Sequence, residues 1–140
     1  MDDSLELDSS QIEIIVHTLK SLIDPWLIIL FGSYAKGRAS HESDVDIGFL
    51  TDQTIDDFQL YRMAQKIAQL IKKDVDCVNL SSASTVFQVQ VIGHGTVLYC
   101  NDETRRKYYF LRTFKEYALL NEERAPILRQ INERGTICGR

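Results

Sequence analysis

Two short apolar runs dominate the first half of the chain, and a polar segment separates them. Residues 26–31 (WLIILF) are apolar without interruption, and residues 45–50 (VDIGFL) form the second run. Runs of this length and composition predict buried β-strands. The segment between them, residues 32–43, is small and polar, which predicts a loop or a short helix. Side chains alternate along a strand, so Asp44 and Asp46 are expected to share one face of a sheet.

Helical patterns flank these two strands. Ser10 and Glu13 have the spacing of a capping box for a first helix, and Pro25 is expected to end it. Apolar residues keep helical spacing again through residues 54–73. The alternating run that follows, residues 74–80 (DVDCVNL), predicts a third strand.

The second half of the chain is less clear at one place. Residues 81–92 alternate like a strand near their end but begin like a helix cap, and we favour a helix. A turn is expected at 93–95 and a short strand at 97–99. From residue 102 onward the pattern is helical and rich in charge and aromatics, and Pro126 is expected to break or restart that helix.

The predicted order is helix, strand, loop, strand, helix, strand, helix, strand, helix. This order predicts an α/β (α+β) fold, with a small mixed β-sheet flanked by helices and a helix at the C-terminus. A length of 140 residues suits one domain. We therefore expect residues 1–100 to form the main body, and residues 101–140 to be a helical extension of the same domain.

Composition limits the possible functions and the possible cellular compartments. The net charge of −4 argues against broad attraction to a nucleic-acid backbone, so direct nucleic-acid binding is not expected. The acidic start, MDDSLELDSS, lacks the pattern of a signal peptide, and no apolar run approaches membrane-spanning length. The three cysteines have no CxxC spacing, so we expect reduced thiols in a cytoplasmic protein without a membrane contact.

The aspartates and the Gly32–Ser33 pair suggest phosphate chemistry. Carboxylates that converge from Asp44, Asp46 and either Asp74 or Asp76 would repel one another, and a bound hard cation such as Mg²⁺ is the usual remedy. Gly32 would let the backbone approach a phosphate, and Ser33 would offer a hydroxyl. The basic side chains of Lys36 and Arg38 lie nearby in the sequence. The pattern predicts a nucleoside triphosphate site that catalyses in-line phosphoryl transfer with two metal ions.

Three motifs carry a resemblance to a known family. GSYAKG, SDVDIGFL and DVDCVNL resemble the signature of the polymerase-beta-like nucleotidyltransferase superfamily, and in particular its minimal nucleotidyltransferase branch. The resemblance covers roughly residues 10–100. In that family the third carboxylate lies between hydrophobic residues of a strand, which fits Asp76 better than Asp74. The resemblance assigns catalytic and metal-binding roles to Asp44, Asp46 and Asp76, nucleotide binding to Gly32 and Ser33, and more weakly phosphate contacts to Lys36 and Arg38.

The resemblance also implies a biological role. Small stand-alone members are paired with a HEPN-domain RNase toxin, in a type VII-like toxin–antitoxin pair. What it implies is that this chain is the antitoxin and transfers AMP from ATP, with Mg²⁺, to a tyrosine of the toxin. The aromatic residues of 108–117 would then offer a surface for the partner. Two alternatives stay open: a small-molecule nucleotidyltransferase of the aminoglycoside type, and a non-catalytic antitoxin that masks its partner.

Overall fold

The fold is built around one mixed β-sheet. The computed structural model describes the backbone of residues 6–133 and the side chains of residues 6–122. Within this part of the chain, four strands form a sheet in the order β3-β2-β1-β4. β1 is antiparallel to β2 and β4, whereas β2 and β3 are parallel. The strands are β1 (Leu27–Phe31), β2 (Val45–Leu50), β3 (Val75–Asn79) and β4 (Thr96–Cys100).

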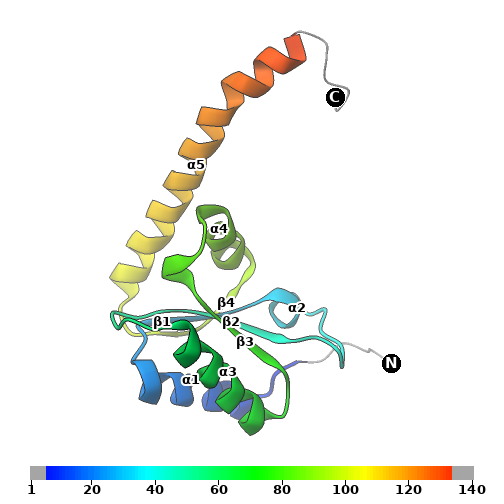
Figure 1. The fold of residues 1–140 in the computed structure, drawn as a ribbon, viewed down its shortest axis with the longest axis vertical. Helices are drawn as coiled ribbons and strands as arrows, with labels where there is room; N and C mark the ends of the chain where they lie inside the picture. The colour runs from blue at the N-terminus through cyan, green and yellow to red at the C-terminus, as the bar shows by residue number, and fades with distance from the viewer. Residues whose placement is uncertain (1–5, 134–140) are drawn as a thin grey trace.

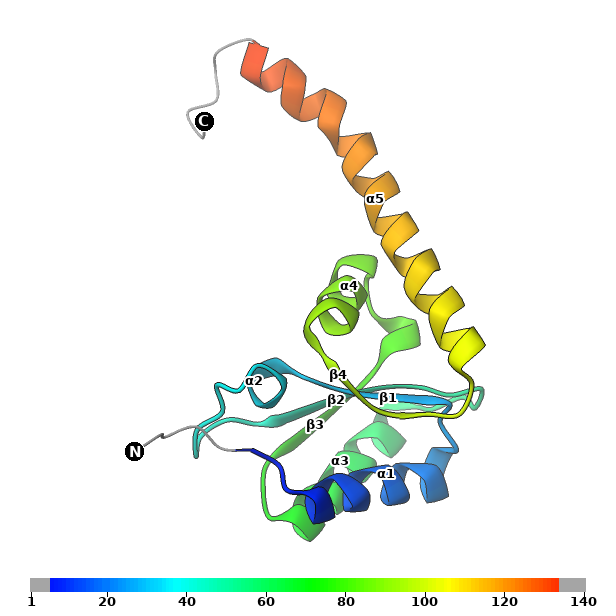
Figure 2. The same ribbon diagram turned by 180° about the vertical axis from the view of Figure 1, so that it is seen from behind.

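Helices cover both faces of the sheet (Figure 1 and Figure 2). α1 and α3 lie on one face, and α4 with the start of α5 lies on the other. The helices are α1 (Ser9–Ile23), α2 (Gly32–Ala35), α3 (Asp57–Ile71), the 3₁₀ turn η1 (Leu80–Ser82), α4 (Thr85–His94) and α5 (Glu103–Glu133). This order confirms the predicted α/β (α+β) architecture with its C-terminal helix. No helix in the described residues is both long and apolar enough to cross a membrane.

Alternation along β2 divides the core into two clusters. Val45, Ile47 and Phe49 are fully buried on the side of α1 and α3. The second cluster lies on the side of α4 and α5, and its members include Leu27, Ile29, Leu50, Leu80 and Tyr109. Asp44 and Asp46 alternate with the first set, so they lie on the α4 face of the sheet.

α1 and α3 begin with the same kind of capping box, and that of α1 lies at another residue than predicted. The Asp8 carboxylate accepts a hydrogen bond from the backbone N–H of Gln11 at 2.8 Å, and the Gln11 side chain accepts one from the backbone N–H of Asp8 at 3.0 Å. Asp56 caps α3 in the same way. The predicted cap at Ser10 was therefore wrong. The earlier start places Leu7 just before the cap, where it packs against the core.

The ambiguous segment, residues 81–92, contains the first part of a helix, as favoured above. α4 begins after Ser84, whose hydroxyl accepts a hydrogen bond from the backbone N–H of Phe87 at 3.1 Å. The predicted turn at 93–95 was only partly right, because the helix continues to His94. Only Gly95 leaves it. A side chain at Gly95 would meet the backbone and side chains of its neighbours, so the chain needs glycine to enter β4 here.

α5 is one continuous helix from Glu103 to Glu133, so the predicted break at Pro126 was wrong. A proline within a helix lacks one backbone hydrogen-bond donor and crowds the preceding turn. The backbone on both sides of Pro126 nevertheless keeps its helical path. Figure 1 shows the helix rising away from the sheet and α4.

The foot of α5 is anchored to the body by polar and aromatic contacts. The guanidinium of Arg105 donates two hydrogen bonds to the Asp52 carboxylate, at 2.6 and 3.1 Å, and lies 4.3 Å from the centre of the Trp26 ring. The Tyr109 hydroxyl donates a hydrogen bond to Oε1 of Gln88 at 2.6 Å. Burial raises the pKa of Tyr109 to about 12. The start of α5 is thus fixed to both the sheet and α4.

Candidate active site

Three aspartates converge at one end of the sheet. Asp46 is the second residue of β2, Asp76 is the second residue of β3, and the parallel register pairs them. Asp44 lies immediately before β2, two residues from Asp46, and so lies on the same face. The structure thus brings Asp44 and Asp46 together with Asp76, the third carboxylate that the family resemblance favoured over Asp74. Asp74 instead lines a small cavity at the end of α3, together with Lys72, Lys73 and Tyr34.

Ionisation of the Asp46 carboxyl group is unfavourable in the folded protein. Its pKa is raised to about 6, first by partial burial and then by the negative charges of Asp76 and Asp44. The charges of Asp44 and Asp76 thus both act on the Asp46 carboxyl, whereas Asp74 is not among the causes. A cation bound at this point would oppose the same repulsion and favour the ionised carboxylate.

The raised pKa of Asp46 predicts that the metal-free protein loses stability as the pH rises. The carboxyl has a pKa of about 6 when folded, against 3.8 for the unperturbed group, so the folded chain binds the proton more tightly. The destabilisation is absent below about pH 4, grows up to about pH 6 and stays constant above. Asp46→Asn removes it. The melting temperature of the variant in EDTA, relative to wild type, should therefore rise by roughly a few degrees across this window.

Asp74→Asn is the control for this pH effect, because it removes a nearby carboxylate that does not perturb Asp46. Its melting temperature should follow the wild-type pH profile. Scanning calorimetry between about pH 4 and pH 8 would measure all three proteins. Parallel profiles for wild type and Asp46→Asn would show that the Asp46 carboxyl titrates normally in the folded chain.

Gly32 lies directly against this cluster. Its φ is +72°, a backbone conformation that residues with a side chain rarely adopt. A Cβ at this position would also collide with Oδ2 of Asp46. The carboxylate therefore packs on the glycine itself, with no side chain between the turn and the strand. The positive φ favours glycine at position 32, and any side chain there would in addition displace the Asp46 carboxylate.

The rest of the turn is closed by its own backbone. α2 is a single turn that starts at Gly32 itself, and the backbone N–H of Lys36 donates to the Gly32 carbonyl at 3.1 Å. The N–H of Arg38 donates to the Ser33 carbonyl at 2.9 Å. In the part of the chain with described side chains, no hydrogen bond engages the Ser33 hydroxyl and no ion pair engages the Lys36 or Arg38 side chain. Both basic side chains are exposed. Their assignment to phosphates stays a prediction.

An aromatic pair that the sequence analysis did not select borders the cluster. Phe31 is the cross-strand partner of Asp46. Its ring meets that of Phe87 from α4 edge to face, with 5.6 Å between the ring centres. The pair places an apolar surface beside the carboxylate. The only sequence signal for this pair was the apolar alternation around Phe87. That pattern indicates secondary structure, but it does not indicate which end of a strand the ring covers.

The described residues hold no ready-made metal centre. Among them, no three histidine, cysteine or carboxylate side chains lie close enough together to hold a metal ion in their present positions. Mutual repulsion of like charges favours such spreading. The aspartates therefore form a charged cluster of oxygen donors and not a preformed cage.

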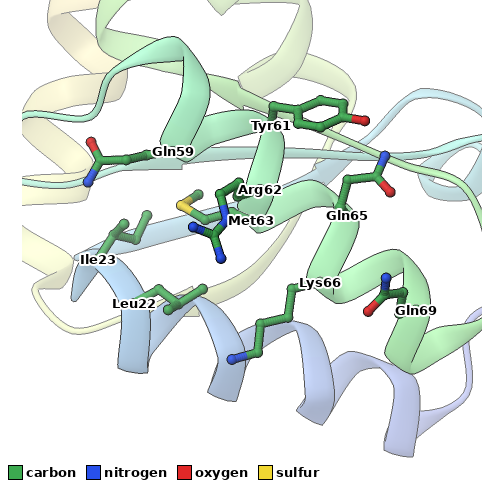
Figure 3. Close-up of a pocket in the computed structure, with 9 residues that line it drawn as sticks. All are labelled: Leu22, Ile23, Gln59, Tyr61, Arg62, Met63, Gln65, Lys66 and Gln69. Atoms are coloured by element: carbon green, nitrogen blue, oxygen red, sulfur yellow. The ribbon is translucent and has the colours of Figure 1, made fainter.

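A separate cavity lies between α1 and α3 (Figure 3). It has a volume of about 620 Å³, and its floor includes Leu22, Ile23 and Met63. Arg62 and Lys66 extend across it in Figure 3. None of its lining residues belongs to the predicted site, and it lies on the opposite face of the sheet from Asp46. It is therefore distinct from the candidate active site.

Functional information comes from solved relatives. A chain in the crystal structure of a toxin–antitoxin with AMP-PNP superimposes with a TM-score of 0.77 at 35% identity, covering 86% of this chain and 97% of that chain. A chain in the structure of the tri-AMPylated Shewanella oneidensis HEPN toxin in complex with MNT antitoxin gives a TM-score of 0.74 at 32% identity. That match covers 89% of this chain and 98% of the other.

Sequence comparison agrees with the structural matches. Protein adenylyltransferase MntA of Shewanella oneidensis is 38% identical over 102 residues, which are 73% of either chain. The family model "Polymerase beta, Nucleotidyltransferase" matches residues 13–104, which include the aspartate cluster and the Gly32–Ser33 turn. The chain therefore belongs to the polymerase beta nucleotidyltransferase family.

Proposed function

We propose that this chain is a protein adenylyltransferase that transfers AMP from ATP to a HEPN-family toxin and acts as its antitoxin. The observation that carries the proposal is the convergence of Asp44, Asp46 and Asp76 on one sheet face, with Asp46 packed against Gly32. A triphosphate needs close backbone approach, which Gly32 allows, and charge compensation, which Mg²⁺ held by the carboxylates would supply. The cytoplasm, which holds ATP and RNA, is the compartment we assign to it.

The relatives support this assignment. MntA is named a protein adenylyltransferase, one solved complex contains AMP-PNP, and another contains a tri-AMPylated HEPN toxin. A further solved form of the MntA complex carries two aspartate-to-glutamate substitutions with a single residue between them. Asp44 and Asp46 have this same spacing.

The site residues divide into two groups in the proposed reaction. Asp44, Asp46 and Asp76 would hold Mg²⁺, because carboxylate oxygens are the ligands that this ion prefers. Bound there, two Mg²⁺ ions would supply Lewis acidity for in-line displacement at the α-phosphorus. Asp76, on the neighbouring strand, would lie on the side of the attacking hydroxyl.

The turn would hold the other end of the nucleotide. The backbone at Gly32 and the free hydroxyl of Ser33 would bind the β- and γ-phosphates, and exposed Lys36 and Arg38 would lie within reach of the departing pyrophosphate. In this scheme residues 1–100 form the minimal nucleotidyltransferase domain. Residues 101–140 form its helical extension and provide a surface for the partner.

The first experiment asks whether AMP is transferred at all. The purified chain is incubated with ATP, Mg²⁺ and a HEPN-family protein from the same organism, and intact-mass spectrometry follows the HEPN protein. We expect a mass increase of one or more AMP units that maps to a tyrosine. EDTA should abolish the transfer and weaken ATP binding, because the three carboxylates repel an uncompensated triphosphate.

An ATP analogue with a methylene group between the α- and β-phosphates is the matched control. It can occupy the site, but the bond that must break is absent, so the HEPN protein should keep its mass. Transfer that is equally fast in EDTA would contradict the metal-dependent site. A HEPN protein that stays unmodified under all conditions would contradict the proposed function.

A further inference from the structure

A stripe of exposed side chains runs along one side of α5. Its members recur every three or four residues, so they share one face of the helix; they are Tyr108, Leu111, Arg112, Lys115 and Leu119. The apolar members are unusually open: 71% of Tyr108, 68% of Leu111 and 49% of Leu119 is exposed. We call this set the α5 stripe. Contiguous apolar exposure of this kind is typical of an interaction surface.

The lower part of the α5 stripe lines a concave surface. A cavity of about 820 Å³ lies between α5, the ends of β1 and β2, and the segment from η1 to α4. Trp26 and Leu50 contribute its buried wall, and Gln88 contributes a polar one. A partner element that covers the stripe would therefore fit into a groove at its lower end and would not rest on a flat surface.

The charge of this groove points to an acidic occupant. Arg105, Arg112 and Lys115 line it, and none of its lining residues is an aspartate or glutamate. Arg105 is already held by Asp52. Arg112 reaches Glu116 only at 3.6 Å, and both side chains are largely exposed, so this pair contributes little. Among the side chains that the structure describes, none forms an ion pair with Lys115.

The groove lies on the same face of the sheet as the aspartates. Leu50 lines it and belongs to the core cluster on the α4 side, as expected from its even spacing with Asp46 along β2. Four residues of extended strand separate the two positions, or about 13 Å at ~3.3 Å per residue. An acceptor protein with a hydroxyl group at the aspartate cluster is large enough to cover the groove as well.

We propose that the α5 stripe docks an acidic amphipathic helix of the acceptor protein. This inference rests on the proposed function, because it specifies how the HEPN-family acceptor is held. Apolar side chains of the acceptor helix pack over Tyr108 and Leu111, and its carboxylates pair with Arg112 and Lys115. A nucleic-acid strand fits less well, because the exposed aliphatic side chains of Leu111 and Leu119 offer its phosphates no hydrogen-bond donor.

The test is the charge reversal Arg112→Glu with Lys115→Glu. The dissociation constant for the HEPN-family acceptor is measured by biolayer interferometry in EDTA without ATP, so that docking is observed without transfer. We expect it to rise at least about tenfold. The matched control is Arg62→Glu with Lys66→Glu on α3, which makes the same charge change on the opposite face of the sheet and should leave the constant within about twofold.

A second variant tests the apolar contact. Tyr108→Ala with Leu111→Ala keeps every charge and should also weaken binding about tenfold or more. In the transfer assay both stripe variants should raise KM for the acceptor and leave kcat unchanged, because no stripe residue contacts the reacting groups. Circular dichroism confirms that the variants keep their helix content.

The outcomes separate docking from catalysis. Wild-type protein that binds the acceptor but transfers no AMP would refute the proposed function and leave the docking surface intact. Unchanged affinity in both stripe variants, with normal transfer by wild type, would overturn the docking proposal. Equal loss of affinity in the α3 control and in the charge-reversed stripe would also overturn it, since the effect would then follow net charge and not position.

Discussion

Asn substitution of both Asp44 and Asp46 is expected to reduce AMP transfer at least about a thousandfold. The two changes remove two negative charges and most of the metal affinity, so several kcal/mol of transition-state stabilisation are lost. Asparagine keeps the shape of the side chain, and both positions lie at an exposed or half-buried strand entrance. The fold should therefore remain intact. Single-turnover transfer of labelled AMP to the HEPN protein measures the effect.

Two control measurements distinguish a loss of catalysis from a loss of the fold. The melting temperature of the double variant in EDTA should equal or exceed that of wild type, because the Asp46 carboxylate, which burial and its charged neighbours disfavour, is removed. Asp74→Asn, a carboxylate outside the cluster, should transfer AMP at close to the wild-type rate. Substantial activity in the double variant would show that the reacting phosphate is bound elsewhere.

Substoichiometric protection is the second large effect. If neutralisation is enzymatic, one molecule of this chain should inactivate many toxin molecules, because a covalent AMP persists after the two proteins separate. An added AMP would bring a negative phosphodiester and a bulky base to a toxin whose RNase site must admit anionic RNA. With ATP and Mg²⁺, RNase activity should fall to background at antitoxin-to-toxin ratios of about one to ten or lower, by the arithmetic of repeated turnover.

A titration of toxin RNase activity distinguishes this from masking. Wild type and the Asp44→Asn, Asp46→Asn variant are each titrated with and without ATP. Enzymatic neutralisation requires ATP and intact aspartates. Masking predicts protection only near one-to-one ratios, with no need for ATP and no loss in the variant. That pattern would assign the biological effect to binding alone, whatever the active site does in vitro.

The sheet was predictable from sequence because its signals are local. The run at 45–50 is bounded by polar residues on the entrance side and became β2 at the predicted residues. Asp44 and Asp46 share a face because the side-chain period of a strand is fixed. Asp76 was preferred over Asp74 only through family resemblance, and the β2–β3 register supplied the spatial reason.

Features that depend on contacts between residues far apart in the chain could not be predicted from the sequence. The cap of α1 lies at Asp8 and not at Ser10, because burial of Leu7 against the core decides between two overlapping signals. The aromatic wall of Phe31 and Phe87 joins residues from β1 and α4. No periodicity along the chain encodes that contact. The groove beside α5 arises likewise from three segments that meet only in the folded protein.

Because Gly32 and Asp46 are in contact, a substitution at one of these positions affects which residues the other can accept. Any larger residue at position 32 collides with the carboxylate, and a shorter side chain at position 46 that would relieve the collision removes the charge. If one of the two residues is substituted and a second substitution at the other position then relieves the contact, reverting only one of them does not restore activity. A chain changed at both positions therefore needs two substitutions together to regain the glycine turn and the carboxylate.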